Sequence, residues 1–137
     1  NESGHKMIER TIIPDDVDKI KETLETMSSQ KEIDCIITTG GTGLTGRDTT
    51  PEAVKEIASK HIDGFGELFR QVSFDKIGTS AIQSRAVAAL INTTYVFCLP
   101  GSTGACKDGW DEILKYQLDI RHKPCNFVEI MPRLNEK

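Results

Sequence analysis

The chain has 137 residues, a formal net charge of −4, 37% hydrophobic residues and 28% charged residues. These values are typical of one soluble globular domain that can bury its own core, and we place this domain over residues 1–137. They exclude a broad basic surface for nucleic acid, and no apolar run approaches the ~20 residues that a membrane-spanning helix needs.

In the first half of the chain, strand-like and helix-like stretches alternate. Residues Asn1–His5 resemble the end of a helix, and the apolar residues of Lys6–Ile13 predict a strand. Apolar residues at three- and four-residue spacing predict a helix over Asp16–Ser28, with Asp15 as its N-cap. A short apolar run predicts a strand over Asp34–Thr38 that is buried on both faces.

The second half of the chain continues this alternation. The expected elements are, in order, a helix opened by Thr50 and Pro51 and ended by Gly64, a short helix over Phe65–Val72, a helix that begins near Ser80, a strand over Thr94–Leu99, a long helix over Ala105–His122 and an extended tail over Lys123–Lys137. Strands that alternate with helices predict an α/β fold, in which helices cover both faces of a mostly parallel sheet.

The four cysteines, at positions 35, 98, 106 and 125, follow no zinc-ligand spacing. Cys35 and Cys98 lie in apolar strand candidates, where a free cysteine behaves as a small hydrophobic residue. We therefore predict reduced, structural thiols and a reducing, cytoplasmic location.

A glycine-rich loop follows the first buried strand and is the main functional motif. Gly40, Gly41, Gly43 and Gly46 leave the backbone free to wrap closely around a ligand, and the amides of such a loop can bind phosphate. The loop formally matches G-x-G-x-x-G, but the helix begins only at Pro51, which disfavours a dinucleotide-binding fingerprint. The lysine of a Walker A loop is also absent, and a tight structural turn is the alternative.

A second loop, Pro100–Gly104, follows the other buried strand and leads into the long helix. In parallel α/β sheets, ligands bind at the carboxyl ends of the strands, so both loops are expected at one rim of the sheet. The amides at the start of the helix would add to an anion site there.

Three carboxylates, Asp15, Asp48 and Glu52, are expected at the same rim. As residues near helix starts, they can serve as caps or compensate the helix dipole. Alternatively, Asp15 and Asp48 hold a magnesium ion beside a phosphate, because Mg²⁺ keeps most of its waters and needs only one or two carboxylates. Both interpretations are open at this point.

Polar residues also gather at the start of the helix expected near Ser80, where Ser84 and Arg85 are the candidates for ligand contacts. Hydroxyl residues at a helix start commonly act as caps. The sharper alternative is a bidentate contact between the Arg85 guanidinium and a phosphate.

Taken together, these segments resemble the MoaB/Mog family of molybdenum cofactor biosynthesis. The matching segments are residues 38–43, 47–53, 64–70, 77–80, 83–86 and 99–103, and residues 117–127 are similar to the MoaB branch in particular. The resemblance implies a three-layer αβα sandwich with a mostly parallel central sheet that binds molybdopterin.

The resemblance also implies a reaction, in which molybdopterin is adenylylated with magnesium ATP before metal insertion. A non-catalytic molybdopterin-binding or carrier protein in the same pathway is the alternative. Asp15 and Asp48 match the family's catalytic aspartates, which would hold Mg²⁺ directly or through water. The residues expected to bind nucleotide or substrate are Gly40, Gly41, Thr42, Gly43, Glu52, Ser84, Arg85, Pro100, Gly101 and Ser102.

Two further expectations come from the family. Its members are homotrimers, or homohexamers in the MoaB branch, whereas the composition of this chain is what predicts no nucleic-acid or membrane partner. They also open with a strand that ends in a Ser-Asp pair, for which this sequence offers no match. We therefore expect the N-terminal strand of the family's sheet to be missing from this chain.

Overall fold

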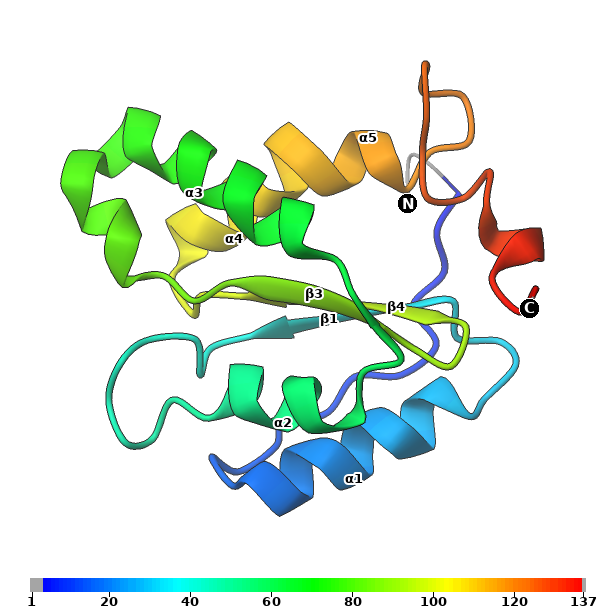
Figure 1. The fold of residues 1–137 in the computed structure, drawn as a ribbon, viewed down its shortest axis with the longest axis horizontal. Coiled ribbons are helices and arrows are strands. Elements are labelled where there is room, and N and C mark those ends of the chain that lie inside the picture. The colour runs from blue at the N-terminus through cyan, green and yellow to red at the C-terminus, as the bar shows by residue number, and fades with distance from the viewer. Residues whose placement is uncertain (1–3, 137) are drawn as a thin grey trace.

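A mixed four-stranded sheet lies between two layers of helices in the computed structural model, which describes residues 4–136 (Figure 1). The strands lie side by side in the order β1-β4-β3-β2; β1 is parallel to β4, and the other two pairs are antiparallel. The predicted α/β sandwich is confirmed, with a mixed rather than mostly parallel sheet. The strands are β1 (Cys35–Thr39), β2 (Lys60–His61), β3 (Val87–Ile91) and β4 (Thr94–Leu99).

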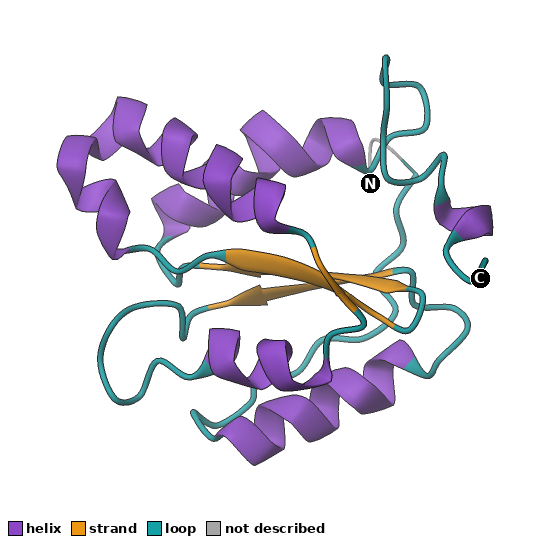
Figure 2. Ribbon diagram, in the orientation of Figure 1, coloured by secondary structure: helices purple, strands orange, loops and turns teal. Residues whose placement is uncertain are grey.

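Helices cover both faces of this sheet (Figure 2). On one face lie α1 and α2; on the other lie α3 and the helical stretch from α4 to α5 (Figure 1). The helices are α1 (Val17–Ser28), α2 (Thr50–Ile57), α3 (Asp63–Ile77), α4 (Thr103–Gly109), the π-helix η2 (Trp110–Leu114) and α5 (Lys115–Gln117), with short 3₁₀ helices η1 (Gly78–Gln83) and η3 (Met131–Arg133).

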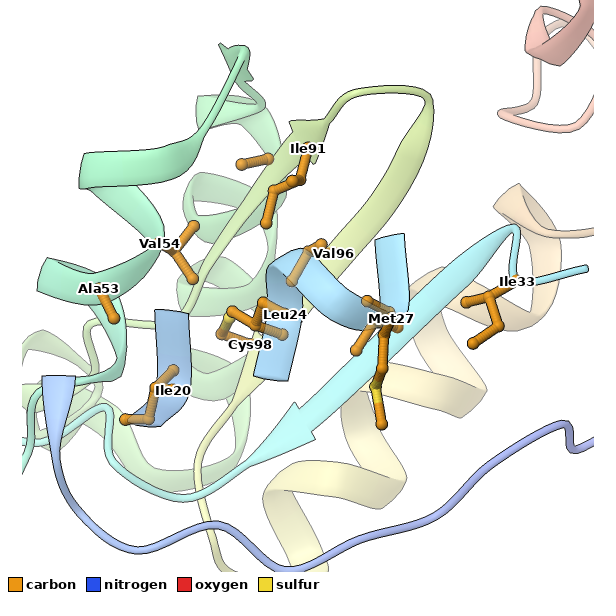
Figure 3. Packing of buried hydrophobic residues seen from close by; sticks show 11 residues of the cluster. Ile20, Leu24, Met27, Ile33, Ala53, Val54, Ile91, Val96 and Cys98 are labelled. Atoms are coloured by element: carbon orange, nitrogen blue, oxygen red, sulfur yellow. The ribbon is translucent and has the colours of Figure 1, made fainter. Parts of the chain in front are cut away.

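The first core forms where the apolar stripe of α1 packs on α2 and the sheet (Figure 3). Ile20, Leu24 and Met27 are buried, as their spacing predicts. Val96 and Cys98 of β4 contribute from the sheet side. Alternate residues of β4, including Phe97, point to the other face and join a second core under α3 and η2. Every residue of β4 is therefore buried.

All four cysteines are free thiols, as predicted. Burial raises the pKa of Cys35 to about 12 and that of Cys98 to about 11. Both thiols are therefore protonated at neutral pH and unreactive. Within residues 4–136, no helix is both long enough and apolar enough to cross a membrane.

The prediction of a helix that begins near Ser80 is wrong, because this part of the chain forms η1 and then strand β3. The spacing of its alanines suits a helix as well as a strand, so local periodicity does not separate the two. The hairpin with β4 decides the outcome. Ile91 pairs with Thr94, and Asn92 adopts the left-handed conformation (φ 57°) that suits a two-residue turn.

The strand predicted over Lys6–Ile13 is also wrong. The segment is extended and mostly exposed, with Ile12 97% accessible, but it pairs with no strand among residues 4–136. A strand needs a neighbour for its backbone hydrogen bonds. In the same region β1 is an edge strand and Ile37 is 43% exposed, so β1 is not buried on both faces as predicted. Most of the helix end predicted at Asn1–His5 lies outside the described residues.

The start of α1 is shifted by one residue from the prediction. Asp16, and not Asp15, is the N-cap: its carboxylate accepts hydrogen bonds from the backbone N–H of Asp18 at 2.9 Å and of Lys19 at 3.3 Å. The side chain of Asp15 is therefore not needed for capping.

Other helix boundaries differ as well. Thr49 occupies the N-cap position of α2, and Thr50 is its first helical residue. Gly64 lies in the first turn of α3 instead of ending a helix, and the last long helical stretch ends at Gln117 rather than His122. The tail contains turns and η3 rather than extended chain alone.

The packing of α1 leads to a stability prediction. Leu24→Ala removes a fully buried side chain, and the resulting cavity should lower the free energy of unfolding by about 3 kcal/mol in urea denaturation. The control Ile12→Ala, at a side chain that is 97% exposed, should change it by less than about 0.5 kcal/mol. Equal effects of the two changes would contradict the assigned core.

Candidate functional site

The two predicted loops leave the sheet side by side. Thr39 and Leu99, the last residues of β1 and β4, are register partners in the parallel ladder. The ladder extends one step further, because the Gly40 N–H donates to the Leu99 carbonyl at 2.9 Å. A Cβ placed on Gly101 would lie 3.4 Å from Cα of Gly40. The structure thus brings both loops to one rim, as expected for strands that run in the same direction.

The glycine loop turns sharply over the start of α2. Gly40 and Gly41 have φ values of +94° and +75°, a conformation that L side chains rarely adopt. At Gly41 a Cβ would also collide with the hydroxyl of Thr50, whose backbone N–H donates to the Gly41 carbonyl at 3.1 Å. A larger residue there would push the loop away from the helix.

Between the two loops lies a cavity of about 350 Å³. Most of the predicted binding residues line it: Gly41, Thr42, Gly43, Asp48, Ser84, Pro100, Gly101 and Ser102. The rest of its lining was not predicted to bind a ligand, namely Phe69, Ser73, Ile77, Ala81, Gln83 and Ala105. These residues come from α3, η1 and α4, and no local pattern indicates that they face the loops.

Arg85 and Glu52 lie behind the loop and not in the cavity lining. The Arg85 guanidinium donates from Nε to the Gly43 carbonyl and from Nη2 to the Asp48 carbonyl, both at 2.7 Å. It also forms an ion pair with Glu52 through Nη1, and a second contact from Nη2 to Glu52 measures 3.3 Å. The Arg85 contact holds the pKa of the Glu52 carboxyl below its usual value.

Asp48 is turned back onto its own loop. Its Oδ2 accepts hydrogen bonds from the Thr45 hydroxyl at 2.7 Å and from the Thr45 backbone N–H at 2.9 Å. The Thr45 hydroxyl makes the largest contribution to holding the pKa of Asp48 below its ordinary value. Asp48 is therefore an ionised carboxylate on the cavity wall at neutral pH.

The structure does not bring Asp15 into the cavity lining. Its Oδ2 lies 3.2 Å from Nη2 of Arg47, whose side chain is 85% exposed. No group of three or more potential metal ligands exists among the described residues. The ionised Asp48 fits the limited demand of a magnesium ion, which one or two carboxylates and a phosphate can hold with the remaining positions taken by water.

The site as a whole combines two kinds of surface. Residues of the two glycine-containing loops line one part of the cavity, and Phe69, Ile77 and Ala81 add apolar side chains to its lining. No lysine or arginine belongs to the cavity lining among residues 4–136. Such a combination suits a ligand that carries both a flat ring and an anionic group. The fold and the site define an α/β protein with a cavity at the carboxyl ends of two parallel strands, the place where such folds commonly bind ligands.

Comparison with known proteins identifies the family to which this chain belongs. Residues 1–120 match the family described as "Probable molybdopterin binding domain". The Escherichia coli protein "Molybdenum cofactor biosynthesis protein B" is 42% identical over 126 residues, which is 92% of this chain and 74% of that protein. Its namesake in Staphylococcus epidermidis is 44% identical over 109 residues, 78% of this chain and 62% of that protein.

Solved structures agree. A crystal structure of molybdenum cofactor biosynthesis protein B matches with a TM-score of 0.86 at 36% identity, over 99% of this chain and 80% of that one. The tungsten cofactor synthesizing protein MoaB of Pyrococcus furiosus matches with a TM-score of 0.75 at 34% identity, over 92% of this chain and 74% of that one. The chain belongs to the molybdopterin-binding-domain family, and the MoaB/Mog resemblance of its sequence is confirmed.

The hydrogen bonds of Asp48 lead to a titration prediction. Thr45→Ala removes the hydroxyl donor but keeps the backbone N–H, so the pKa of Asp48 should rise part of the way towards 3.8, the value of an ordinary aspartate. Because the folded-state pKa is depressed, the contribution of Asp48 to stability is present above pH 3.8 and is lost as the pH falls below it. NMR titration of the Asp48 carboxyl carbon measures the shift.

Thr49→Ala is the matched control for this titration. Thr49 is adjacent to Asp48, and its hydroxyl has no hydrogen-bond partner in the part of the chain that the structure describes. This change should leave the pKa of Asp48 where it is. An unchanged pKa in Thr45→Ala would show that Thr45 does not hold the carboxylate.

Proposed function

We propose that this chain binds molybdopterin in the cavity between its two loops and adenylylates it with magnesium ATP. The observation that supports the proposal most directly is the shared rim. Two loops at the ends of neighbouring parallel strands face one cavity, in a chain of the molybdopterin-binding-domain family. Molybdopterin combines a fused ring system with a terminal phosphate, which corresponds to the apolar and polar walls of the cavity.

The proposed reaction is a nucleotidyl transfer. An oxygen of the molybdopterin phosphate attacks the α-phosphorus of ATP, a new P–O–P linkage forms, and the bond to the departing pyrophosphate breaks. The attacking phosphate is already an anion, so the reaction needs no strong base. The protein then contributes mainly by holding the two reactants in line and by placing dipoles against the charge of the phosphates.

Each part of the site has a role in this proposal. The amides of Gly41–Gly43 and of the Gly101–Ser102 segment bind phosphate oxygens. Asp48, which lines the cavity, holds Mg²⁺ directly or through water, and Asp15 joins through water. The ion, when bound, neutralises phosphate charge. Ser84 contacts the pterin side of the cavity.

One observation favours the alternative of a carrier that binds molybdopterin without turnover. Both candidate catalytic carboxylates already have protein partners, since Asp15 contacts Arg47 and Asp48 contacts Thr45. A protein of this kind would use the same loops for the pterin phosphate and would have no need of ATP.

A substitution tests the enzymatic role. Asp48→Ala should retain the fold and lower the formation of adenylylated molybdopterin from magnesium ATP by about a hundredfold. The reason is that Mg²⁺, the counter-ion of the negative charge in the transition state, would lose the carboxylate that holds it. Asp75→Ala, at an exposed carboxylate of α3, is the matched control and should keep full activity. Full turnover in a stable Asp48→Ala protein would refute the assigned role.

Calorimetry separates the enzyme from the carrier. Titration with magnesium ATP should give a measurable affinity if the chain is an adenylyltransferase. If molybdopterin binds but magnesium ATP does not, the carrier function is the correct one.

The homotrimer or homohexamer expected from the family is part of the same proposal. Exposed apolar side chains on α3 and η1 are candidates for contacts between subunits: Phe74 is 57% exposed, Ile77 60% and Ile82 82%. Analytical ultracentrifugation measures the assembly state.

A further inference from the structure

We propose that Arg85 and Glu52 form a positioning pair, which holds the glycine loop in the shape that lets Gly43 and Asp48 line the cavity. Both residues were predicted from the sequence to contact the ligand. The structure instead places them behind the loop, outside the cavity lining. The proposal rests on the proposed function only where ligand affinity is concerned.

The guanidinium joins parts of the chain that are distant in sequence. Its Nε reaches the carbonyl of Gly43 near the start of the loop, and its Nη2 reaches the carbonyl of Asp48 at the end, each at 2.7 Å. On its other side it is held by Glu52 in the first turn of α2. The guanidinium of Arg85 thereby connects the start of the loop, the end of the loop and helix α2.

These contacts occupy the donors of Arg85. Nε, Nη1 and Nη2 all donate to acceptors of the protein itself, and the side chain is only 31% exposed. A guanidinium committed in this way cannot form the two parallel hydrogen bonds of a phosphate clamp without giving up a loop contact. Its geometry is that of a structural brace.

The loop needs such a brace because little else holds its middle. Leu44 is 70% exposed and the side chain of Arg47 is 85% exposed, so neither anchors the loop by packing, and Arg47 reaches Asp15 only through an ion pair at the surface, a weak contact in water. Within the loop, the Asp48 N–H donates to the Thr45 carbonyl at 3.0 Å, and the Asp48 carboxylate binds Thr45 in return. These bonds close the turn but do not attach it to the body of the protein.

The backbone of Arg85 extends the connection into the cavity. Its N–H donates to the carbonyl of Thr42 at 2.9 Å. Thr42 lines the cavity, and so does Ser84, the residue before Arg85. Movement of Arg85 would therefore displace the lining from two directions. We expect its substitution to affect the unliganded loop first and ligand affinity as a consequence.

Hydrogen exchange of the unliganded protein tests the proposal. Arg85→Lys keeps the charge but not the planar fork. Peptides covering residues 40–52 should then exchange about tenfold faster, the change expected from the loss of one charge-assisted hydrogen bond, whereas peptides of α1 and β4 should not change. Arg133→Lys is the control, because Arg133 makes a surface pair with Glu136 and holds no loop.

Two results would overturn the positioning role. One is unchanged exchange over residues 40–52 in Arg85→Lys, and the other is a uniform increase across the whole chain, which would indicate general destabilisation. If Arg85→Lys does not fold, Glu52→Gln takes its place. It should accelerate exchange in the same peptides by a smaller factor, and no acceleration there would overturn the proposal.

Titration with magnesium ATP distinguishes positioning from direct contact. A positioning role predicts weaker binding in Arg85→Lys together with faster exchange of the unliganded loop. Weaker binding with an unchanged loop would mean that Arg85 touches the ligand, and would refute the proposal. If the unmodified protein binds no magnesium ATP, the proposed function fails, yet the exchange comparison still decides the role of Arg85.

Discussion

The parallel pairing of β1 with β4 is the constraint from which the geometry of the site follows. Because the two strands run in the same direction, their last residues, Thr39 and Leu99, end at the same level of the sheet. The chain leaves both strands at this level, and the hydrogen bond from Gly40 to Leu99 holds the departing segments together. An antiparallel arrangement would have separated the two loops by the length of a strand.

Close approach at this rim requires glycine, and glycine brings a cost that other parts of the chain offset. Gly40 and Gly41 adopt conformations that other residues avoid, but a glycine-rich loop loses more entropy on ordering. The structure compensates with hydrogen bonds to fixed partners: Thr50 binds the carbonyl of Gly41, and Arg85 binds those of Thr42 and Gly43. The loop is flexible by composition and ordered by its surroundings.

The difference between local sequence and three-dimensional surroundings also explains what the sequence could and could not predict. Strand β4 and the buried stripe of α1 were predicted because their signals lie within a few neighbouring residues. Strand β3 was missed because its alanines fit two periodicities, and only the hairpin with β4 separates them. Arg85 was singled out as a functional candidate, but its acceptors Gly43 and Asp48 lie 42 and 37 residues away, so its place behind the loop required the fold. The apolar cavity wall from α3 and η1 was missed for the same reason.

The distribution of charge at the rim has a consequence for recognition. Arg85 is engaged by the loop and Glu52, Arg47 contacts Asp15, and the described cavity lining contains no basic side chain. For the anionic ligand that we propose, backbone N–H dipoles of the loops would be the main attraction that the protein itself supplies. Side-chain substitution does not remove these donors, so sensitivity to mutation should concentrate in the residues that orient the backbone. Recognition of this kind depends on shape at least as much as on charge, which agrees with a chain whose net charge is −4.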